Sequence, residues 1–175
     1  MKEFKMDTDI DHVEEWLNNL SKQGKAMIGC SANVYEFEDA APGKYEYHIG
    51  FIRNMKPDYV NLWIYDLSKQ GIEFVAKDNM WIYFRSTQPF SLYPTTKERS
   101  NVLKDIRNLY LEISTAFVTL AAIIGWFTSK SKTKKKTVPY FISAVLGPCG
   151  GFYAVQFGKY EKKLIADKKA EKALD

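Results

Sequence analysis

The chain has 175 residues and a formal net charge of +4, and 46% of its residues are hydrophobic while 26% are charged. This apolar fraction excludes a chain that is disordered throughout, and 10 Gly and 6 Pro are too few for a collagen-like or low-complexity protein. Only two cysteines, Cys30 and Cys149, argue against a disulfide-stapled secreted scaffold. The charged N-terminal segment lacks an apolar stretch, so we expect no cleavable signal peptide.

Hydrophobic patterning divides the chain into a soluble part and an apolar part. In residues 1–94, short apolar segments alternate with charges, which predicts a soluble domain. A basic amphipathic helix is expected over 95–108, next to the membrane. Two apolar runs predict transmembrane helices over 109–128 and 138–157, and a charged cytoplasmic tail follows over 158–175.

The soluble part contains an internal repeat. Residues 11–24 read DHVEEWLNNLSKQG and residues 58–71 read DYVNLWIYDLSKQG, at a constant offset of 47 positions. This agreement indicates a duplication with copies over about 1–40 and 45–90.

Each copy predicts one amphipathic helix. Apolar residues recur at the i, i+3, i+4 and i+7 positions of a helix in both copies: Val13, Trp16, Leu17 and Leu20, then Val60, Trp63, Ile64 and Leu67. Thr8 or Asp9 can cap the first helix, and Pro57 suits the first turn of the second. Gly24 and Gly71 stand where a helix ends in a left-handed residue.

Short strand-like runs flank both helices. They cover Lys2 to Met6, Ala26 to Cys30, Val34 to Glu38, Tyr45 to Arg53, Ile72 to Ala76, and Met80 to Arg85. Asn and Asp in the tight connections indicate hairpins. The expected fold is therefore α+β: a duplicated strand–helix–strand–strand unit that forms an antiparallel sheet with two helices on one face, followed by a two-helix transmembrane hairpin.

Aromatic residues on the predicted strands suggest a binding surface. Because side chains alternate along a strand, we expect some rings to lie on the sheet face that the helices leave open. The proposed contact residues are Tyr35, Phe37, Tyr47, Trp81 and Tyr83. A ligand, a partner protein, a second copy, or the juxtamembrane helix could cover them, and we favour dimerisation or self-packing over a small ligand.

The two apolar runs fit a bilayer better than a soluble core. Residues 113–129 and 138–157 carry no charge and show no polar face, whereas soluble helices usually have one. The alternative is a pair of buried helices in a soluble protein. Gly147, Gly150 and Gly151 weaken a soluble helix but permit close packing in a membrane.

Lysine and arginine residues indicate the topology. Five lysines lie in the connection from Lys130 to Val138, and ten basic residues flank the hairpin at its two ends. Since both ends of a two-helix hairpin share one side, we expect both termini in the cytoplasm and a multi-pass location in the cell membrane. The flanking cations would then face anionic lipid, or they are simply solvated.

Three phrases in the first half resemble a known family. WLNNLSKQG, NVYEFEDAAPGKYEYHIGFI and DLSKQGIEFVAKDNMWIYFR are similar to motifs of the bacterial domain-of-unknown-function family 2812, over about residues 1–90. Lys25 departs from the family, which often has an aromatic residue there. The resemblance implies C-terminal membrane spans and an association with PadR-like repressors, and it brings no catalytic residues.

No constellation of residues indicates an enzyme. His12 and His48 join no metal-ligand pattern, and the sequence has no phosphate loop, nucleophile elbow or dinucleotide fingerprint. We therefore predict no catalytic residue, no metal, no cofactor and no direct contact with nucleic acid. The favoured function is a membrane-anchored sensory or protein-interaction module, whose partners are the lipid bilayer, a PadR-like regulator or a homodimer. The alternatives are a small-ligand-binding domain that uses a cleft between the repeats, and an enzyme of unknown class.

Overall fold

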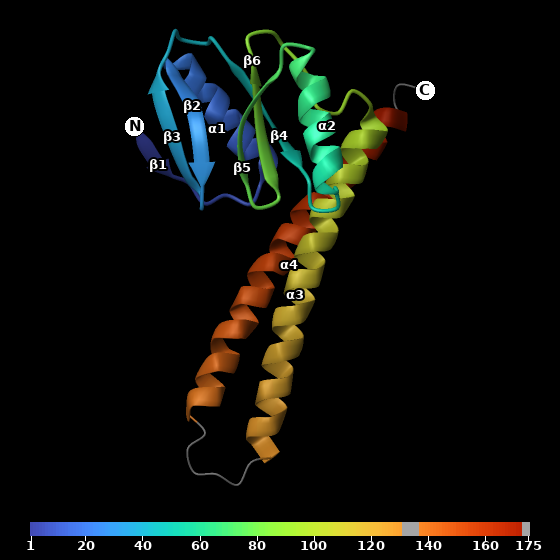
Figure 1. Cartoon of the computed structure of the whole chain (residues 1–175). Coiled ribbons are helices and arrows are strands. Elements are labelled where there is room, and N and C mark those ends of the chain that lie inside the picture. Colours follow the sequence, from blue (N-terminus) through green and yellow to red (C-terminus); the bar gives the residue numbers. More distant parts are fainter. Residues whose placement is uncertain (131–136, 173–175) are drawn as a thin grey trace. The chain divides into compact units, whose positions relative to one another are not determined.

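The computed structural model describes residues 1–130 and 137–172 (Figure 1). The chain divides into two compact units, Met1–Pro94 and a second that begins at Thr95. We call the first the head and the two helices of the second the hairpin.

The head contains the predicted unit twice. The first copy consists of β1 (Lys2–Phe4), α1 (Ile10–Lys22), β2 (Lys25–Ser31) and β3 (Val34–Asp39). The second consists of β4 (Glu46–Phe51), α2 (Pro57–Ser68), β5 (Glu73–Asp78) and β6 (Trp81–Ser86). The α+β class and the duplicated strand–helix–strand–strand order are thus confirmed.

The strands form two antiparallel sheets, where we had expected one. One sheet has the order β1-β3-β2 and the other β4-β6-β5, as Figure 1 shows. In each copy the strand before the helix pairs with the last strand of the same copy, so each repeat completes its own sheet. The strand pairs β2–β3 and β5–β6 each contain a register shift, and the two shifts occupy corresponding places. They lie between Met27 and Gly29 and between Phe74 and Ala76. The duplication therefore extends to the β-bulges, which are specific local features.

The helix ends follow the local sequence. Asp9 is the N-cap of α1, and its side chain accepts a hydrogen bond from Asp11 N. Pro57 occupies the first turn of α2. Gly24 and Gly71 have φ angles of 80° and 78°, in the left-handed region that glycine adopts without strain.

The two helices of the head do not cover one common sheet face. On one side, α1 packs Trp16 edge-on against Tyr35 and Phe37 of β3, at centroid distances of 5.0 and 5.8 Å. On its other side, the Asn18 amide bonds to Tyr47 N and O, and Glu14 accepts a hydrogen bond from Ile49 N. These side chains satisfy the free edge of β4. The α1 helix therefore contacts both sheets, whereas the prediction placed both helices on one face of a single sheet.

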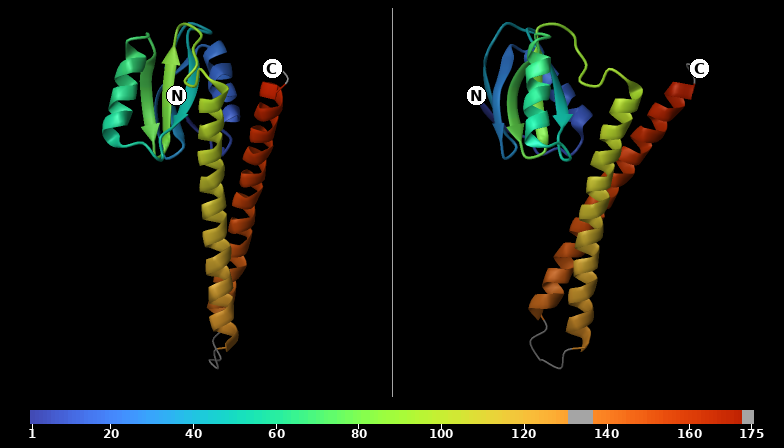
Figure 2. Two further views of the ribbon diagram at one scale, coloured as in Figure 1. Left: turned by 90° about the vertical axis from the view of Figure 1, so that its right-hand side faces the viewer. Right: turned by 45° about the vertical axis from the view of Figure 1, so that its right-hand side comes forward.

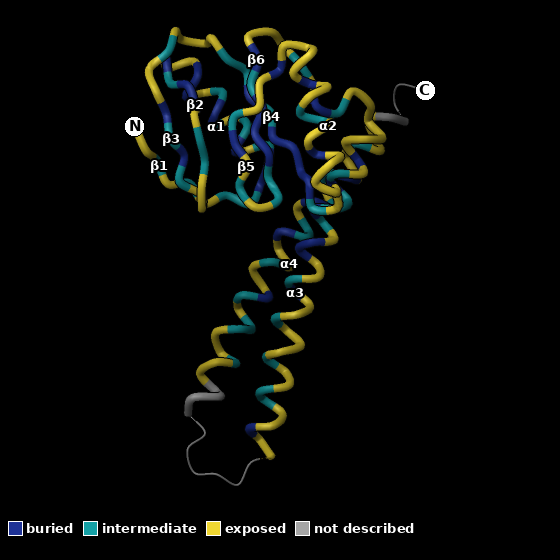
Figure 3. Tube along the Cα trace, in the orientation of Figure 1, coloured by how far each residue is buried: buried dark blue, intermediate teal, exposed yellow. Residues whose placement is uncertain are grey.

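By contrast, α2 packs on only one sheet. Its Val60 and Leu67 join a buried cluster with Ile52, Ile72, Ile82, Phe84 and Leu92, and Trp63 and Ile64 pack against it. Figure 3 shows the buried residues concentrated in the head, and Figure 2 gives two further views of its helices and strands.

The hairpin consists of α3 (Thr96–Lys130) and α4 (Thr137–Lys172), which lie side by side in Figures 1 and 2. The juxtamembrane segment and the first apolar run form one uninterrupted helix. The charged tail continues α4 as far as Lys172, and Pro148 lies inside the helix. Residues 131–136 of the predicted lysine-rich connection and residues 173–175 of the tail lie outside the described residues.

Small and aromatic residues hold the two helices together. Ser114 Oγ donates to Gly150 O at 2.9 Å, and Tyr110 stacks on Tyr153 with 6.0 Å between ring centroids. A Cβ atom on Gly150 would lie 2.8 Å from Val118 Cγ2, so the helices approach closely because this residue is glycine.

Large apolar side chains cover the outside of the hairpin. Exposed members include Leu111, Val118, Leu120, Trp126, Phe141 and Phe152. Both helices are long and apolar enough to cross a membrane, and only 17% and 11% of their most apolar windows are buried. A core helix of a soluble protein is mostly buried, so this low burial favours lipid as the surrounding medium.

Candidate functional site

The predicted aromatic residues lie mostly inside the head. Tyr35, Phe37, Tyr47 and Tyr83 are each at most 4% exposed, whereas Trp81 is half-buried. The expectation that these rings form an open sheet face is therefore wrong for four of the five. The reason is non-local: the second sheet and α1 cover the face that a single sheet would have left open.

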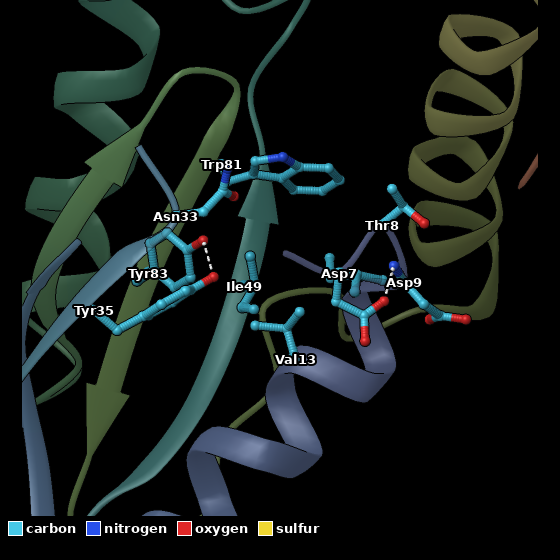
Figure 4. Close-up of a pocket in the computed structure, with 10 residues that line it drawn as sticks. Asp7, Thr8, Asp9, Val13, Asn33, Tyr35, Ile49, Trp81 and Tyr83 are labelled. Atoms are coloured by element: carbon cyan, nitrogen blue, oxygen red, sulfur yellow. Dashed lines mark hydrogen bonds between the residues drawn. The ribbon is translucent and has the colours of Figure 1, made fainter. Parts of the chain in front are cut away.

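These buried rings join the two repeats. The Tyr35 and Tyr83 hydroxyls lie 3.0 Å apart, as the dashed line in Figure 4 marks. Met27 N donates to the Tyr47 hydroxyl at 2.9 Å, and Met27 O accepts from Arg85 Nη1 at 3.1 Å. Side chains of the second repeat thus satisfy both backbone groups of Met27 in the first repeat, which gives these residues a structural role.

Burial raises the pKa of the tyrosine and cysteine side chains in this region. It raises the pKa of Tyr35 to about 12 and shifts the pKa of Tyr83 strongly upward. Burial, followed by the nearby Asp78 carboxylate, raises the pKa of the Cys30 thiol to about 11. A thiol with such a pKa holds too little thiolate to act as a nucleophile.

A small pocket lies between the repeats beside this cluster (Figure 4). Its lining includes Tyr35, Ile49, Trp81 and Tyr83, with Asp7 and Asp9 on the helix side. Its volume of about 20 Å³ accommodates little more than one water molecule. In this conformation, the pocket is too small for a metabolite.

His48 of β4 forms a charged cluster with Glu14 of α1 and Glu46 of its own strand. Its Nδ1 lies 3.3 Å from Glu14 Oε2, and its Nε2 lies 3.1 Å from Glu46 Oε1. The Phe90 ring packs edge-on at 4.8 Å. Burial alone lowers the pKa of His48, but hydrogen bonds and charge interactions with both carboxylates outweigh it, and the net effect raises this pKa. Within residues 1–130 and 137–172, no group of three His, Cys, Asp or Glu side chains could hold a metal ion.

A larger groove opens near the C-terminal end of α1. Its walls are Asn18 and Lys22 of α1, residues 43–46, and residues 87–89. We call it the lysine groove, because Lys22 and Lys44 both line it. Its volume of about 460 Å³ lies within the range of about 300–1,000 Å³ that is typical of ligand sites.

The outer face of α2 is the most apolar exposed surface of a head helix. Tyr59, Leu62 and Tyr65 are 63%, 53% and 56% exposed. The 47-residue offset aligns them with His12, Glu15 and Asn18 of α1, which are polar. In α1, His12 and Glu15 are exposed as well, and only Glu14 and Asn18 are half-buried against β4. The corresponding residues of α2, Asn61 and Tyr65, are exposed.

A known protein family matches this chain. A family model described as "Protein of unknown function (DUF2812)" matches residues 9–115, which is more than half of the chain. The chain belongs to this family. No curated protein and no solved structure matches it.

The family match extends further than the motif resemblance. The motifs cover about residues 1–90, whereas the match to DUF2812 continues through α3 as far as residue 115. The DUF2812 region of this chain thus includes both repeats after residue 8 and the first half of α3.

The sequence contained signals for the two surfaces that our prediction missed in this DUF2812 chain. Tyr59, Leu62 and Tyr65 fall opposite the apolar stripe of α2, so the aligned repeats already showed an extra apolar face. For the lysine groove, the sequence showed that Lys22 and Lys44 are present, but it did not show that they line one groove. Their approach depends on contacts between α1 and residues 43–47, which local sequence patterns do not reveal.

Proposed function

We propose that this protein is a membrane-anchored, non-enzymatic interaction module whose head binds a protein partner through the outer face of α2. The hairpin supports the anchoring part of this proposal, because its exposed apolar surface has the length and composition of a membrane segment. Burial raises the pKa of the Cys30 thiol to about 11, so this side chain is poorly suited to act as a nucleophile.

The observation that carries the proposal is the difference between the two copies of one helix. In α1 the aligned positions of the outer face are the polar residues His12, Glu15 and Asn18. In α2 they are the large side chains Tyr59, Leu62 and Tyr65, each more than half exposed. Exposed tyrosine and leucine side chains on one helix face are typical of protein-binding surfaces.

The partner that we propose is a PadR-like transcriptional repressor, held at the membrane and released in response to a signal. This part of the proposal rests on the family resemblance. The head carries no nucleic-acid recognition motif, so the regulation would act through the repressor.

Replacing Leu62 with glutamate tests the surface. Leu62→Glu gives α2 the residue that α1 has at the aligned position, Glu15, and it should abolish partner capture, because a charge in the centre of an apolar contact is desolvated without compensation. The measurement is affinity purification of the full chain from native membranes in mild detergent, followed by mass spectrometry.

Ile28→Glu is the matched control, since Ile28 is 47% exposed and lies on β2, away from α2. This variant should retain the same partner. Equal recovery by the Leu62→Glu variant would refute the surface. Recovery of only further copies of this chain would replace the repressor with a homodimer.

A further inference from the structure

The lysine groove combines a preformed shape with basic side chains. Hydrogen bonds fix its walls: Ser21 Oγ donates to Tyr45 O at 2.6 Å, and Gly43 N donates to Ser21 O at 2.7 Å. The Asn18 amide is held by Tyr47 N and O. A groove with walls held in this way needs little reorganisation before a ligand binds.

The charges at the groove favour an anion. Lys22 projects from the last turn of α1, and Lys44 lies on the facing segment. Neither lysine forms an ion pair with a carboxylate of the described residues. The acid on the wall, Glu46, lies 3.1 Å from His48, which also contacts Glu14, so the imidazolium offsets part of the charge of these two carboxylates.

A third cation, Arg85, lies near Lys44 and is itself paired with Glu73 at 2.8 Å. The Lys44 ammonium and the Arg85 guanidinium both contact the Tyr45 ring, at 4.8 and 4.2 Å from its centroid. The side-chain hydrogen bond with Tyr45 is the main cause that raises the pKa of Lys44, and it outweighs the repulsion by Arg85, so Lys44 is protonated at neutral pH.

We propose that the lysine groove binds a small soluble anion that carries two or more carboxylate or phosphate groups. Lys22 of α1 and Lys44 of the segment 43–46 bind the charged groups, while the amide of Gln88 and the hydroxyl of Thr87 provide neutral hydrogen-bonding groups. This ligand site is separate from the outer face of α2, and it gives the interaction module a means to sense a metabolite.

The test is isothermal titration of the full chain in phosphatidylcholine nanodiscs with citrate and with inorganic phosphate, and with sorbitol as an uncharged control. We expect saturable binding of at least one of the two anions, no binding of sorbitol, and weaker binding at higher salt. Removing both charges with Lys22→Gln/Lys44→Gln should weaken the affinity about tenfold or more, because each lysine provides a charge-assisted hydrogen bond.

Two further variants separate a built site from general charge effects. Lys56→Gln/Lys77→Gln removes the same charge at exposed positions outside the groove and should bind as the parent protein does. Lys22→Arg/Lys44→Arg keeps the charge and should bind within a few-fold of the parent, which also shows that the substituted groove still folds. Absence of binding by both anions, or equal losses in the two glutamine variants, would overturn the site. Neither result bears on partner capture through α2.

Discussion

His48 links two elements that come from different repeats. Glu14 reaches it from α1 and Glu46 from its own strand, β4, and the Phe90 ring covers its remaining side. The two carboxylates favour the imidazolium form, and the pKa of His48 is therefore raised above the ordinary value of 6.5. The cluster connects α1 to β4 by charge as well as by hydrogen bonds.

The stability of the head should consequently depend on pH through this residue. Because the pKa is higher in the folded than in the unfolded chain, the contribution of His48 is complete below about pH 6.5 and is lost as the pH rises through the folded value. We expect His48→Gln to lower the free energy of unfolding by about 1 kcal/mol at pH 6 and by less at pH 9.

Thermal denaturation of the full chain in detergent, followed by tryptophan fluorescence, measures this effect, since Trp16, Trp63 and Trp81 lie in the head. The control is His12→Gln, whose exposed imidazole lies 3.8 Å from Asp7. A difference between parent and His48→Gln that stays constant from pH 6 to 9 would contradict the assignment.

At the scale of elements, local patterns predicted the helices and strands well. The i, i+3, i+4 spacing, Asp9, Pro57 and the two glycines predicted both head helices to within about two or three residues, because these signals act within one turn. They did not predict which strands pair. The strand β4 pairs with β6 of its own repeat, and α1 side chains from the first repeat bond to its other edge, which is a non-local arrangement.

The aromatic prediction failed for the same reason. Alternation correctly implied that Tyr35 and Tyr83 point away from their neighbours on the strand, but it carries no information about what lies opposite. In the structure, the two hydroxyls face each other across the repeats. The duplicated sequence showed that two similar units exist, and it did not show how one unit covers the other.

Gly150 determines how closely the two hairpin helices pack. We expect Gly150→Leu to destabilise the hairpin by about 1–3 kcal/mol, because its side chain would overlap Val118 and displace the Ser114 hydroxyl from the Gly150 carbonyl. Far-ultraviolet circular dichroism during thermal unfolding in detergent provides the measurement.

Gly151→Leu is the matched control on the same helix, since a Cβ atom at Gly151 meets nothing within 4 Å. This substitution should leave the unfolding temperature unchanged or raise it, because leucine favours a helix more than glycine does. Equal destabilisation by both substitutions would mean that the close approach at Gly150 contributes nothing to the packing.

At the scale of the whole molecule, the chain combines a head with a conventional buried core and a hairpin with its apolar side chains outside. The charged ends of the two helices are themselves paired: Arg107 bonds Glu161 at 2.7 Å, and Arg99 lies 3.6 Å from Asp167. The two helices therefore stay associated beyond their apolar segments, so that a continuous two-helix stalk would lead away from the bilayer surface.

This arrangement predicts how the protein behaves when cells are fractionated. Leu120 and Ile123 are exposed near the middle of the first apolar run, and arginine at the bilayer centre costs about 2.5–3.5 kcal/mol per residue. The parent protein should remain in the membrane pellet after a carbonate wash. Leu120→Arg/Ile123→Arg should shift most of it to the supernatant, whereas Ile28→Arg in the head should not. If the parent chain were soluble, its exposed apolar hairpin would need another cover, and the anchoring role would be wrong.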